Sequence, residues 1–358
     1  MQGRVQKLRA LLDREALEGL LVTSPVNRRY ITGFTGSAGV ALISKHEALL
    51  ITDFRYVDQA RDQAPGYDIV NHSGKLAETI AAEVKKRNIE RLGFEQDHLT
   101  YSQYMAFNKV LKDADCQLVP VSGLVEELRL VKDEQEIELI RQAAAIADQT
   151  YTHISNWIKP GMREIEVAHE IEFFMRQQGA SSSSFEIIVA SGVRSALPHG
   201  VASEKVIERG DFVTLDFGAY YQGYVSDMTR TLAIGEPAPK LKEIYDICLE
   251  AQIRGVESIK AGMTGKEADA VCRDYITRKG YGDNFGHSTG HGIGLEVHEG
   301  PTLSVRGELP LKPGMVVTVE PGIYLSGIGG VRIEDDVLIT EEGNEILTKS
   351  TKELVIIE

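Results

Sequence analysis

The sequence predicts an α/β domain followed by an α+β domain, and three observations support this fold class. Helical and strand-like stretches alternate over the first third of the chain, which is typical of a central sheet covered by helices. A long polar helix with acidic residues in its first turn is expected at 133–157. Further helices and carboxylate-bearing hairpins follow it. Because 358 residues exceed one ordinary core, we expect two domains, 1–124 and 125–358.

Each element of the first domain follows from the spacing of its apolar residues. A recurrence every three to four residues predicts a helix, and a short apolar run between turn residues predicts a strand. The Ser-Pro-Val-Asn segment at 24–27 is expected to form a loop. The expected helices are 2–18, 54–63, 75–88 and 102–112, and the expected strands are 20–23, 40–44, 48–53, 91–94 and 117–120.

The second domain is expected to combine helices with antiparallel hairpins. Its strands do not alternate strictly with helices, which is typical of an α+β arrangement. The expected helices after the one at 133–157 are 164–178, 240–261 and 264–279, and the expected strands are 186–190, 211–218, 224–232, 315–320 and 331–339.

The charge and cysteine content exclude several classes of protein. Asp plus Glu number 53 against 39 for Lys plus Arg, and the resulting charge of −14 disfavours nucleic acid and anionic membranes as partners. The three cysteines form no CxxC pair, so reduced thiols are expected rather than disulfides or a thiolate zinc site. The N-terminus has no apolar signal region and no run approaches the ~20 apolar residues of a membrane span. We therefore expect a cytoplasmic protein.

Two aspartates lie on the two arms of a predicted hairpin at 213–232. The midpoint of Asp216 and Asp227 falls between Tyr221 and Gln222. If the turn centres there, the two side chains face each other with Cβ atoms about 4.5–5.5 Å apart. Two ionised carboxylates so close repel each other unless a cation lies between them. The alternative is an ordinary hairpin with two exposed aspartates.

A second hairpin repeats this arrangement with glutamates. Glu320 and Glu334 are equidistant from Gly327 in the glycine-rich turn. Arg332 shares a strand face with Glu334, because side chains alternate along a strand. It could hold that carboxylate or bind a substrate carboxylate with two hydrogen bonds. A surface salt bridge is the alternative.

Three histidines fall within twelve positions of the glycine-rich segment 286–301, at His287, His291 and His298. Glycine at this density makes sense where the backbone approaches something closely, such as a ligand. The glycines oppose a helix, so we do not expect an HxxxH metal helix, and HExxH is absent. His199 lies in a predicted loop that could display a reactive group. A flexible loop with satisfied or exposed histidines is the alternative.

Four carboxylates and one imidazole are more ligands than one catalytic metal with an open position needs. Four carboxylates carry a charge that two divalent cations balance, so a dinuclear site is favoured. Oxygen-rich ligation suits Mn²⁺, whereas a structural zinc site would use Cys and His. Two such ions activate water and polarise a scissile carbonyl, which predicts a hydrolase.

The segments LDFGAYYQGYVSDMTRT, GHSTGHGIGLEVHE, VTVEPGIY and GVRIEDD resemble those of the pita-bread metallopeptidases. The resemblance is closest to the Xaa-Pro branch, prolidase and aminopeptidase P, and covers essentially the whole chain. Residues 27–39 and 51–60 resemble the N-terminal creatinase-like domain of these enzymes. The resemblance implies a creatinase-like α/β domain followed by a pita-bread catalytic domain.

The resemblance also implies a role for each site residue. Glu320 doubles as the general base. The implied metal ligands are Asp216, Asp227, His291, Glu320 and Glu334; the implied substrate- and proton-handling histidines are His199, His287 and His298; Tyr324 and Arg332 are expected to bind substrate.

The implied reaction is hydrolysis of an Xaa-Pro peptide bond with two divalent metal ions, Mn²⁺ in the first place and Co²⁺, Fe²⁺ or Zn²⁺ as alternatives. The implied partners are a peptide with proline at its second position and a second copy of the chain in a homodimer. The short chain favours a dipeptidase over aminopeptidase P, which acts on longer peptides. A creatinase-like C–N hydrolase and a non-catalytic binding module are more distant alternatives, because all five ligands are present. Methionine aminopeptidases usually lack the N-terminal domain.

Overall fold

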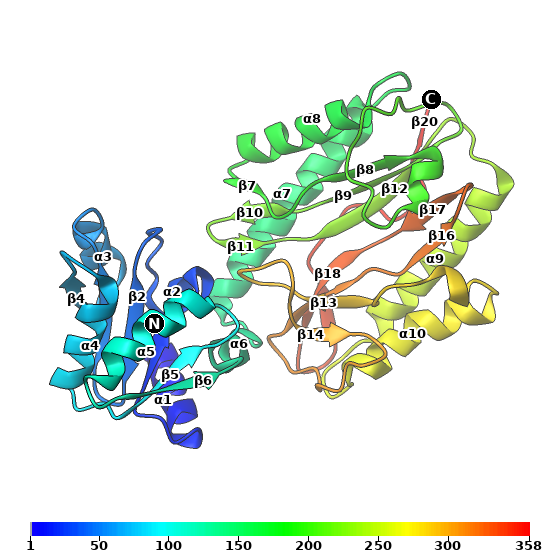
Figure 1. Ribbon diagram of the computed structural model, residues 1–358. Helices are drawn as coiled ribbons and strands as arrows, with labels where there is room; N and C mark the ends of the chain where they lie inside the picture. The colour runs from blue at the N-terminus through cyan, green and yellow to red at the C-terminus, as the bar shows by residue number, and fades with distance from the viewer. Residues whose placement is uncertain (1) are drawn as a thin grey trace. The chain divides into compact units, whose positions relative to one another are not determined.

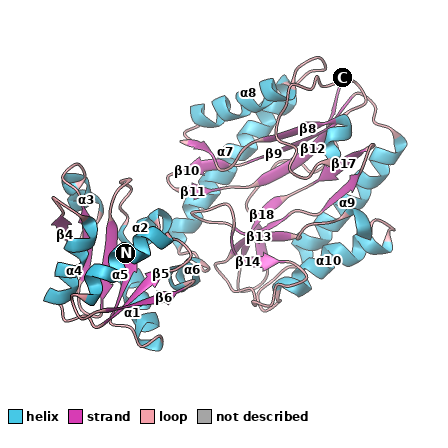
Figure 2. Cartoon of the chain, viewed as in Figure 1, coloured by secondary structure: helices cyan, strands magenta, loops and turns pink. Residues whose placement is uncertain are grey.

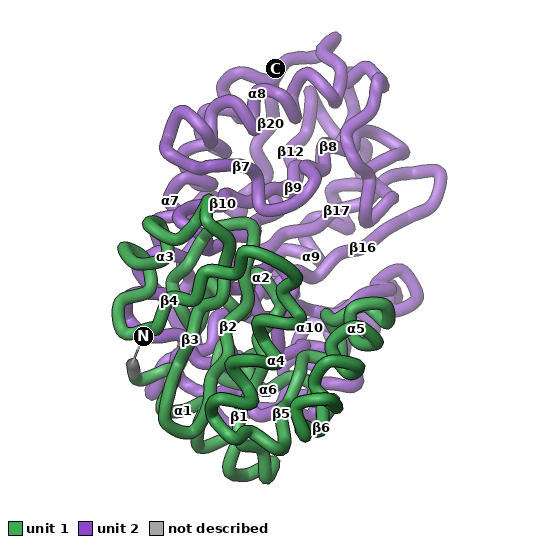
Figure 3. The backbone as a smooth tube through the Cα atoms, turned by 60° about the vertical axis from the view of Figure 1, so that its left-hand side comes forward, with its two compact units in different colours: residues 1–129 green, residues 130–358 purple. Residues whose placement is uncertain are grey.

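Residues 1–129 form one unit and residues 130–358 a second in the computed structural model, which describes residues 2–358 (Figure 3). The division lies at the end of α6, Leu124–Arg129, a few residues beyond the expected boundary at 124/125. None of the helices within residues 2–358 is long and apolar enough to cross a membrane.

A mixed six-stranded sheet forms the centre of the first unit, in the order β4-β3-β2-β1-β5-β6 (Figure 1). The pairs β1–β2 and β2–β3 are antiparallel, and the other pairs are parallel. The strands are β1 (Gly19–Val22), β2 (Val40–Ser44), β3 (Ala48–Thr52), β4 (Asp68–Asn71), β5 (Arg91–Glu95) and β6 (Gln117–Val121). The helices are α1 (Gln2–Arg14), α2 (Pro25–Thr32), α3 (Val57–Gln63), α4 (Leu76–Lys86), α5 (Tyr101–Lys112) and α6.

Helix α2 replaces the loop expected at 24–27, and that prediction is wrong. Ser24 caps the helix, since its side chain accepts a hydrogen bond from the Asn27 N–H at 3.3 Å. Pro25 stands in the first turn, where its missing N–H costs nothing, and Gly33 ends the helix with φ of 80°. Ser-Pro is therefore a helix start here rather than a turn.

Two pairs of helices enclose the strands of the second unit (Figure 2). The long helix begins as predicted, because Asp133 and Glu136 accept hydrogen bonds from each other's backbone N–H. Buried side chains of α7 and α8 pack with one group of strands, and those of α9 and α10 with another. The helices are α7 (Glu134–Trp157), α8 (Glu164–Gln177), α9 (Pro239–Ser258) and α10 (Gly265–Arg278), with short 3₁₀ turns η1 (Gly192–Ala196) and η2 (Gly282–Asn284).

Two main sheets run through this unit, in the orders β20-β12-β9-β8 and β14-β13-β15-β18-β19. Smaller sheets are formed by β11-β10-β7 and β16-β17. The strands are β7 (Ser182–Ser183), β8 (Ile188–Ser191), β9 (Phe212–Phe217), β10 (Ala219–Tyr221), β11 (Tyr224–Val225), β12 (Met228–Ile234), β13 (Gly290–Gly292), β14 (Glu299–Leu303), β15 (Val316–Val319), β16 (Gly322–Leu325), β17 (Gly329–Arg332), β18 (Asp335–Ile339), β19 (Asn344–Ile346) and β20 (Ile356–Ile357).

The first carboxylate hairpin turns one residue later than expected. Gln222 and Gly223 both have positive φ, 46° and 96°, as the central residues of a type I′ turn require. The register therefore sets Asp216 opposite Thr229 rather than Asp227. The expectation that the two aspartates face each other directly is wrong, and they approach diagonally.

The second hairpin keeps the register expected from its sequence. In β16–β17, Tyr324 pairs with Gly330, and in β15–β18, Val319 pairs with Asp335. Both ladders centre on Gly327, and the gap between them holds Glu320 and Glu334. The predicted strand 331–339 is thus two strands, β17 and β18, separated at the glutamate.

Candidate metal centre and catalytic site

A cavity of about 810 Å³ lies within the second unit and is lined by elements from both halves of that unit. It gathers nine of the ten site residues expected from the sequence, and the exception is Tyr324. The nine are His199, Asp216, Asp227, His287, His291, His298, Glu320, Arg332 and Glu334.

Three of the acidic residues lie where strands break. Asp227 stands between β11 and β12, Glu320 after β15, and Glu334 between β17 and β18. At each break the backbone N–H leaves its ladder and finds another acceptor, as buried donors must. The acceptors are Asp336 Oδ2 for Asp227, the Thr289 carbonyl for Glu320 and the Thr229 carbonyl for Glu334.

The ligand atoms of three residues from three different hairpin arms converge closely. One ligand atom each from Asp227, His291 and Glu334 lie within 4.8 Å of one another. His291 Nε2 is 3.6 Å from Asp227 Oδ2 and 3.4 Å from Glu320 Oε1. Asp216 reaches the same cavity from β9. This arrangement is the one expected of a shared cation site.

The carboxylates of this cluster are buried close to one another, and their negative charges favour binding of a cation. Burial, with repulsion from neighbouring carboxylates in addition, raises the pKa of Asp227 and of Glu334 well above their usual range. Burial likewise raises the pKa of Glu320 to about 7. Asp216 Oδ1 is buried and has no hydrogen-bond partner within residues 2–358. A divalent cation would compensate the charges and occupy that oxygen, so the residues fit a metal centre.

His291 is oriented as a ligand. Its Nδ1 lies 3.1 Å from the Gly292 carbonyl, so that nitrogen carries the proton and Nε2 keeps its lone pair toward the carboxylates. Burial lowers the pKa of His291, which favours the neutral ring that metal binding needs. The absence of a helix here agrees with the prediction, since β13 is extended.

The glycines around His291 serve the packing of strands. A side chain at Gly290 would meet the Thr318 carbonyl oxygen at 1.9 Å, and one at Gly292 would meet the Gly300 carbonyl oxygen at 2.0 Å. The expectation of close approach is correct, but the approaching group is neighbouring backbone rather than a ligand.

Arg332 is buried and donates hydrogen bonds to four groups. The alternative of a surface salt bridge is therefore wrong. Arg332 Nη2 lies 2.5 Å from Asp216 Oδ2, its Nη1 donates to Tyr324 Oη and the Pro198 carbonyl, and its Nε donates to Thr229 Oγ1. The sequence pattern suggested Glu334 as its partner, and that suggestion is wrong. Glu334 accepts instead from the Thr229 hydroxyl, and Arg332 reaches Asp216, which lies opposite Thr229 in the β9–β12 ladder.

His287 and Tyr324 form a pair at the edge of the cavity. His287 Nδ1 lies 2.8 Å from the Ser288 carbonyl and Nε2 lies 2.8 Å from Tyr324 Oη, so the tyrosine hydroxyl donates to the imidazole. Burial, with the nearby Arg332 charge in addition, lowers the pKa of His287 to about 4. Tyr324 thus contacts His287 and Arg332, which line the cavity, but does not itself line it.

The remaining two histidines belong to loops on the cavity wall. The His298 ring lies 4.4 Å from that of His291, and burial is the largest cause that lowers the pKa of His298. His199 follows Pro198, whose carbonyl accepts from Arg332. Both histidines line the cavity, so both can contact a bound molecule.

Two residues that support the site, Thr318 and Lys132, were not predicted from the sequence. Thr318 donates to Glu320 Oε1 at 3.2 Å and accepts from the His291 N–H at 3.1 Å. Lys132 is buried against Glu299, with Nζ 3.2 Å from Oε2. Thr318 could have been found as the polar residue two positions before Glu320, on the same strand face. The Lys132 pair joins residues far apart in the sequence and left no local signal.

Two family models match the chain. One, described as Metallopeptidase family M24, matches residues 138–341, and the other, described as Creatinase/Prolidase N-terminal domain, matches residues 4–131. These matches confirm the predicted order of a creatinase-like α/β domain and a pita-bread domain.

The chain is also similar over its length to known proteins. An uncharacterized peptidase of Bacillus subtilis is 58% identical over 354 residues, covering 99% of this chain and 100% of that protein. The Xaa-Pro dipeptidase of Pyrococcus furiosus is 43% identical over 364 residues, covering 99% and 100%. The solved structure of the Xaa-Pro dipeptidase from Bacillus anthracis has a TM-score of 0.98 at 62% identity and covers 99% of each chain. The chain therefore belongs to metallopeptidase family M24 and is a peptidase with a creatinase/prolidase N-terminal domain ahead of its catalytic domain.

Proposed function

We propose that the chain is an Xaa-Pro dipeptidase that works with two divalent metal ions. The observation that carries the proposal is the convergence of four carboxylates and one imidazole on one wide cavity. The names of the Pyrococcus furiosus and Bacillus anthracis relatives support the Xaa-Pro substrate. The residues that would hold the ions are Asp216, Asp227, His291, Glu320 and Glu334.

Two metal ions, when bound, supply an activated water and polarise the scissile carbonyl. Their charge balances the four carboxylates, and the oxygen-rich set suits Mn²⁺, with Co²⁺, Fe²⁺ and Zn²⁺ also compatible. Arg332 compensates part of the charge of Asp216 and occupies one of its oxygens, which leaves Oδ1 available for ligation.

The proton of the attacking water goes to Glu320. This carboxylate lines the cavity, and Thr318 fixes one of its oxygens. Glu320 then delivers the proton to the leaving nitrogen, which becomes the amine of proline. His287 Nδ1 lies 3.9 Å from Glu320 Oε2, and its neutral ring keeps that edge of the site uncharged.

The rest of the cavity wall binds the peptide. The Xaa-Pro nitrogen carries no hydrogen, so a site must select it by shape. The apolar wall of Phe185, Ile188, Val201 and Val297 suits the proline ring and the neighbouring side chain. His199 and His298 are available to hydrogen-bond the substrate carbonyl and carboxylate, which would orient the scissile bond.

The deciding experiment combines metal analysis with two substrates. Protein stripped with EDTA should be inactive, and Mn²⁺ should restore hydrolysis of Ala-Pro with two ions bound per chain. Activity that survives exhaustive EDTA would support a creatinase-like C–N hydrolase instead. A protein that binds no stoichiometric transition metal would be a non-catalytic module.

The second substrate distinguishes the two Xaa-Pro activities. A dipeptidase should cleave Ala-Pro more efficiently than a longer Xaa-Pro-Pro peptide. A strong preference for the longer peptide would favour aminopeptidase P, and a solved X-Pro aminopeptidase from Thermotoga maritima is 42% identical with a TM-score of 0.90 over 96% of this chain and 98% of that chain. Light scattering tests the homodimer that the resemblance to Xaa-Pro peptidases implies.

A further inference from the structure

Glu186 is a carboxylate of the cavity wall that has no partner. It lines the cavity, is exposed, and makes no hydrogen bond or ion pair within residues 2–358. The other acids of the wall differ from it. Asp216, Asp227, Glu320 and Glu334 belong to the candidate metal centre, and Glu299 is paired with Lys132.

Glu186 lies two residues before β8 and follows the side-chain alternation of that strand. Ile188 lies directly opposite Asp216 in the β8–β9 ladder, so both side chains are on the same face of the sheet. The chain before Ile188 continues this alternation, because Ile187 and Val189 are buried in the core while Glu186 and Ile188 line the cavity. Glu186 therefore lies about 7 Å from Ile188 along the extended chain that leads into β8, on the side that carries Asp216.

The surroundings of Glu186 suit a long side chain with a cationic end. Phe185, Ile188 and Val297 give the neighbouring wall an apolar surface. Lysine and arginine bury their methylene stems on such surfaces and keep the charged head near water. The Glu186 carboxylate would repel the C-terminal carboxylate of a bound dipeptide, which belongs to the proline residue. The wall around Glu186 therefore suits the side chain of the residue before proline.

We propose that Glu186 selects substrates in which the residue before proline is arginine or lysine. The inference rests on the proposed Xaa-Pro dipeptidase function and names its preferred substrate class. The carboxylate acts by pairing with the guanidinium or ammonium group of the substrate side chain. It takes no part in bond cleavage.

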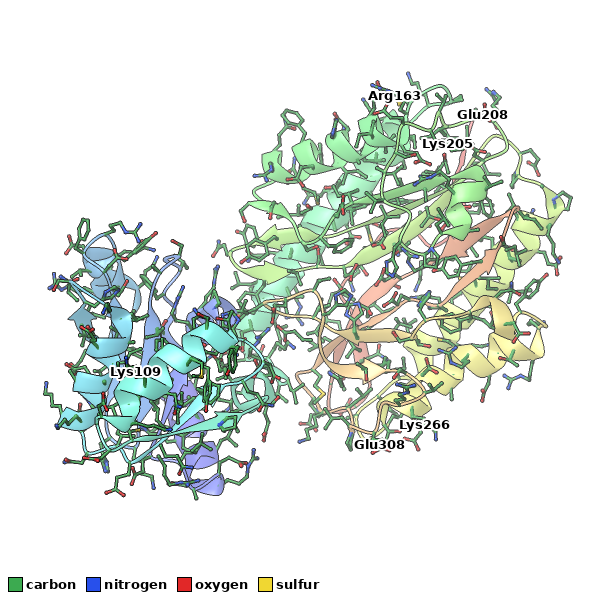
Figure 4. The ribbon with its side chains drawn as sticks, viewed as in Figure 1. Lys109, Arg163, Lys205, Glu208, Lys266 and Glu308 are labelled. Carbon is green, nitrogen blue, oxygen red and sulfur yellow. The ribbon has the colours of Figure 1, made fainter. Side chains whose placement is uncertain are left out.

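The test compares substrates of equal shape and different charge. Arg-Pro is compared with citrulline-Pro, and Lys-Pro with norleucine-Pro, in the Mn²⁺-loaded enzyme. The ratio of kcat/KM within each pair isolates the charge of the side chain. The variant is Glu186→Gln, and Glu308→Gln is the matched control because Glu308 is exposed, lies between β14 and β15 and does not line the cavity (Figure 4).

The wild-type enzyme and Glu308→Gln should prefer the charged member of each pair about 2- to 5-fold, as expected of an ion pair open to solvent. Glu186→Gln should bring both ratios to about one, because kcat/KM falls more for Arg-Pro and Lys-Pro than for citrulline-Pro and norleucine-Pro. The preference should also shrink in high salt, because exposed charges are screened.

Two outcomes would overturn the inference while leaving the proposed function intact. One is an unchanged ratio in Glu186→Gln. The other is an equal loss for all four substrates, which would show that Glu186 binds the α-amino group that they share. Failure of the wild-type enzyme to cleave even norleucine-Pro would contradict the Xaa-Pro function itself, and this inference with it.

Discussion

Arg332 Nη2 lies 2.5 Å from Asp216 Oδ2, so a buried guanidinium holds one carboxylate of the candidate metal centre from outside the proposed ligand set. The same guanidinium donates to the hydroxyl of Tyr324 and to the backbone of the loop that carries His199. One side chain thus joins a candidate ligand, a histidine partner and a cavity loop.

Arg332→Met should lower metal affinity about 10- to 100-fold, the usual effect of losing a group that orients a metal ligand. Arg332→Lys should recover only part of the loss, because a single ammonium cannot reproduce the fork that reaches Asp216 and Tyr324 together. Isothermal titration with Mn²⁺ measures both effects. Arg163→Met, on the surface, serves as the control, and wild-type affinity in Arg332→Lys would contradict the argument.

Asp227→Asn should abolish metal binding and activity while the protein remains folded. The amide cannot supply the charge that the ions require, but it has nearly the same shape. It also removes a carboxylate whose pKa burial and neighbouring carboxylates raise, so the melting temperature of the metal-free variant should be no lower than that of the metal-free wild type. Elemental analysis and circular dichroism melts measure the two effects. Near-native turnover would refute the assignment of Asp227.

Thr318→Val should weaken metal binding about 10-fold, because the hydroxyl that orients Glu320 is replaced by a methyl group of similar size. Thr214→Val is a matched control. Thr214 is also buried in a strand, but its hydroxyl lies 3.3 Å from that of Thr231 and makes no hydrogen bond to a candidate ligand within residues 2–358. Titration of both variants with Mn²⁺ decides the matter, and equal affinities would remove Thr318 from the site.

His298→Ala should retain both metal ions and lose turnover about 100-fold or more, the scale of a lost proton-handling or orienting group. His298 lines the cavity beside His291 and is not needed to complete the ligand set. Elemental analysis and steady-state kinetics measure the two properties. Parallel loss of metal and activity would instead make His298 a ligand.

Metal should stabilise the protein more at pH 8 than at pH 5. The folded-state pKa values of Asp227, Glu320 and Glu334 are raised, so these groups contribute fully to the stability of the metal-free fold below their unfolded pKa of about 4. The contribution is lost progressively as pH rises from there through the folded values, which for Glu320 is about 7. Melting curves with Mn²⁺ and with EDTA should therefore diverge as pH rises, and a constant difference would contradict this linkage.

The sequence by itself determined most of the helices and the residue types of the site. The helix at Glu134–Trp157 begins where the acidic capping residues predict, because a capping box is made by neighbours within one turn. The register of the glutamate hairpin also follows from local sequence, because the glycine-rich turn around Gly327 joins strands that are close neighbours in the chain. Alternation along a strand likewise separated Asp335, which pairs with Arg230, from Asp336, which accepts from Asp227.

The tertiary structure decided which of these groups meet. The register of the aspartate hairpin depended on two left-handed residues, Gln222 and Gly223, and a one-residue shift of the turn changed the cross-strand partner of Asp216. The partner of Arg332 and the buried Lys132–Glu299 pair depend on contacts between sheets and loops. Local periodicity specifies only which side of an element a residue occupies, whereas these contacts follow from how the elements pack against one another.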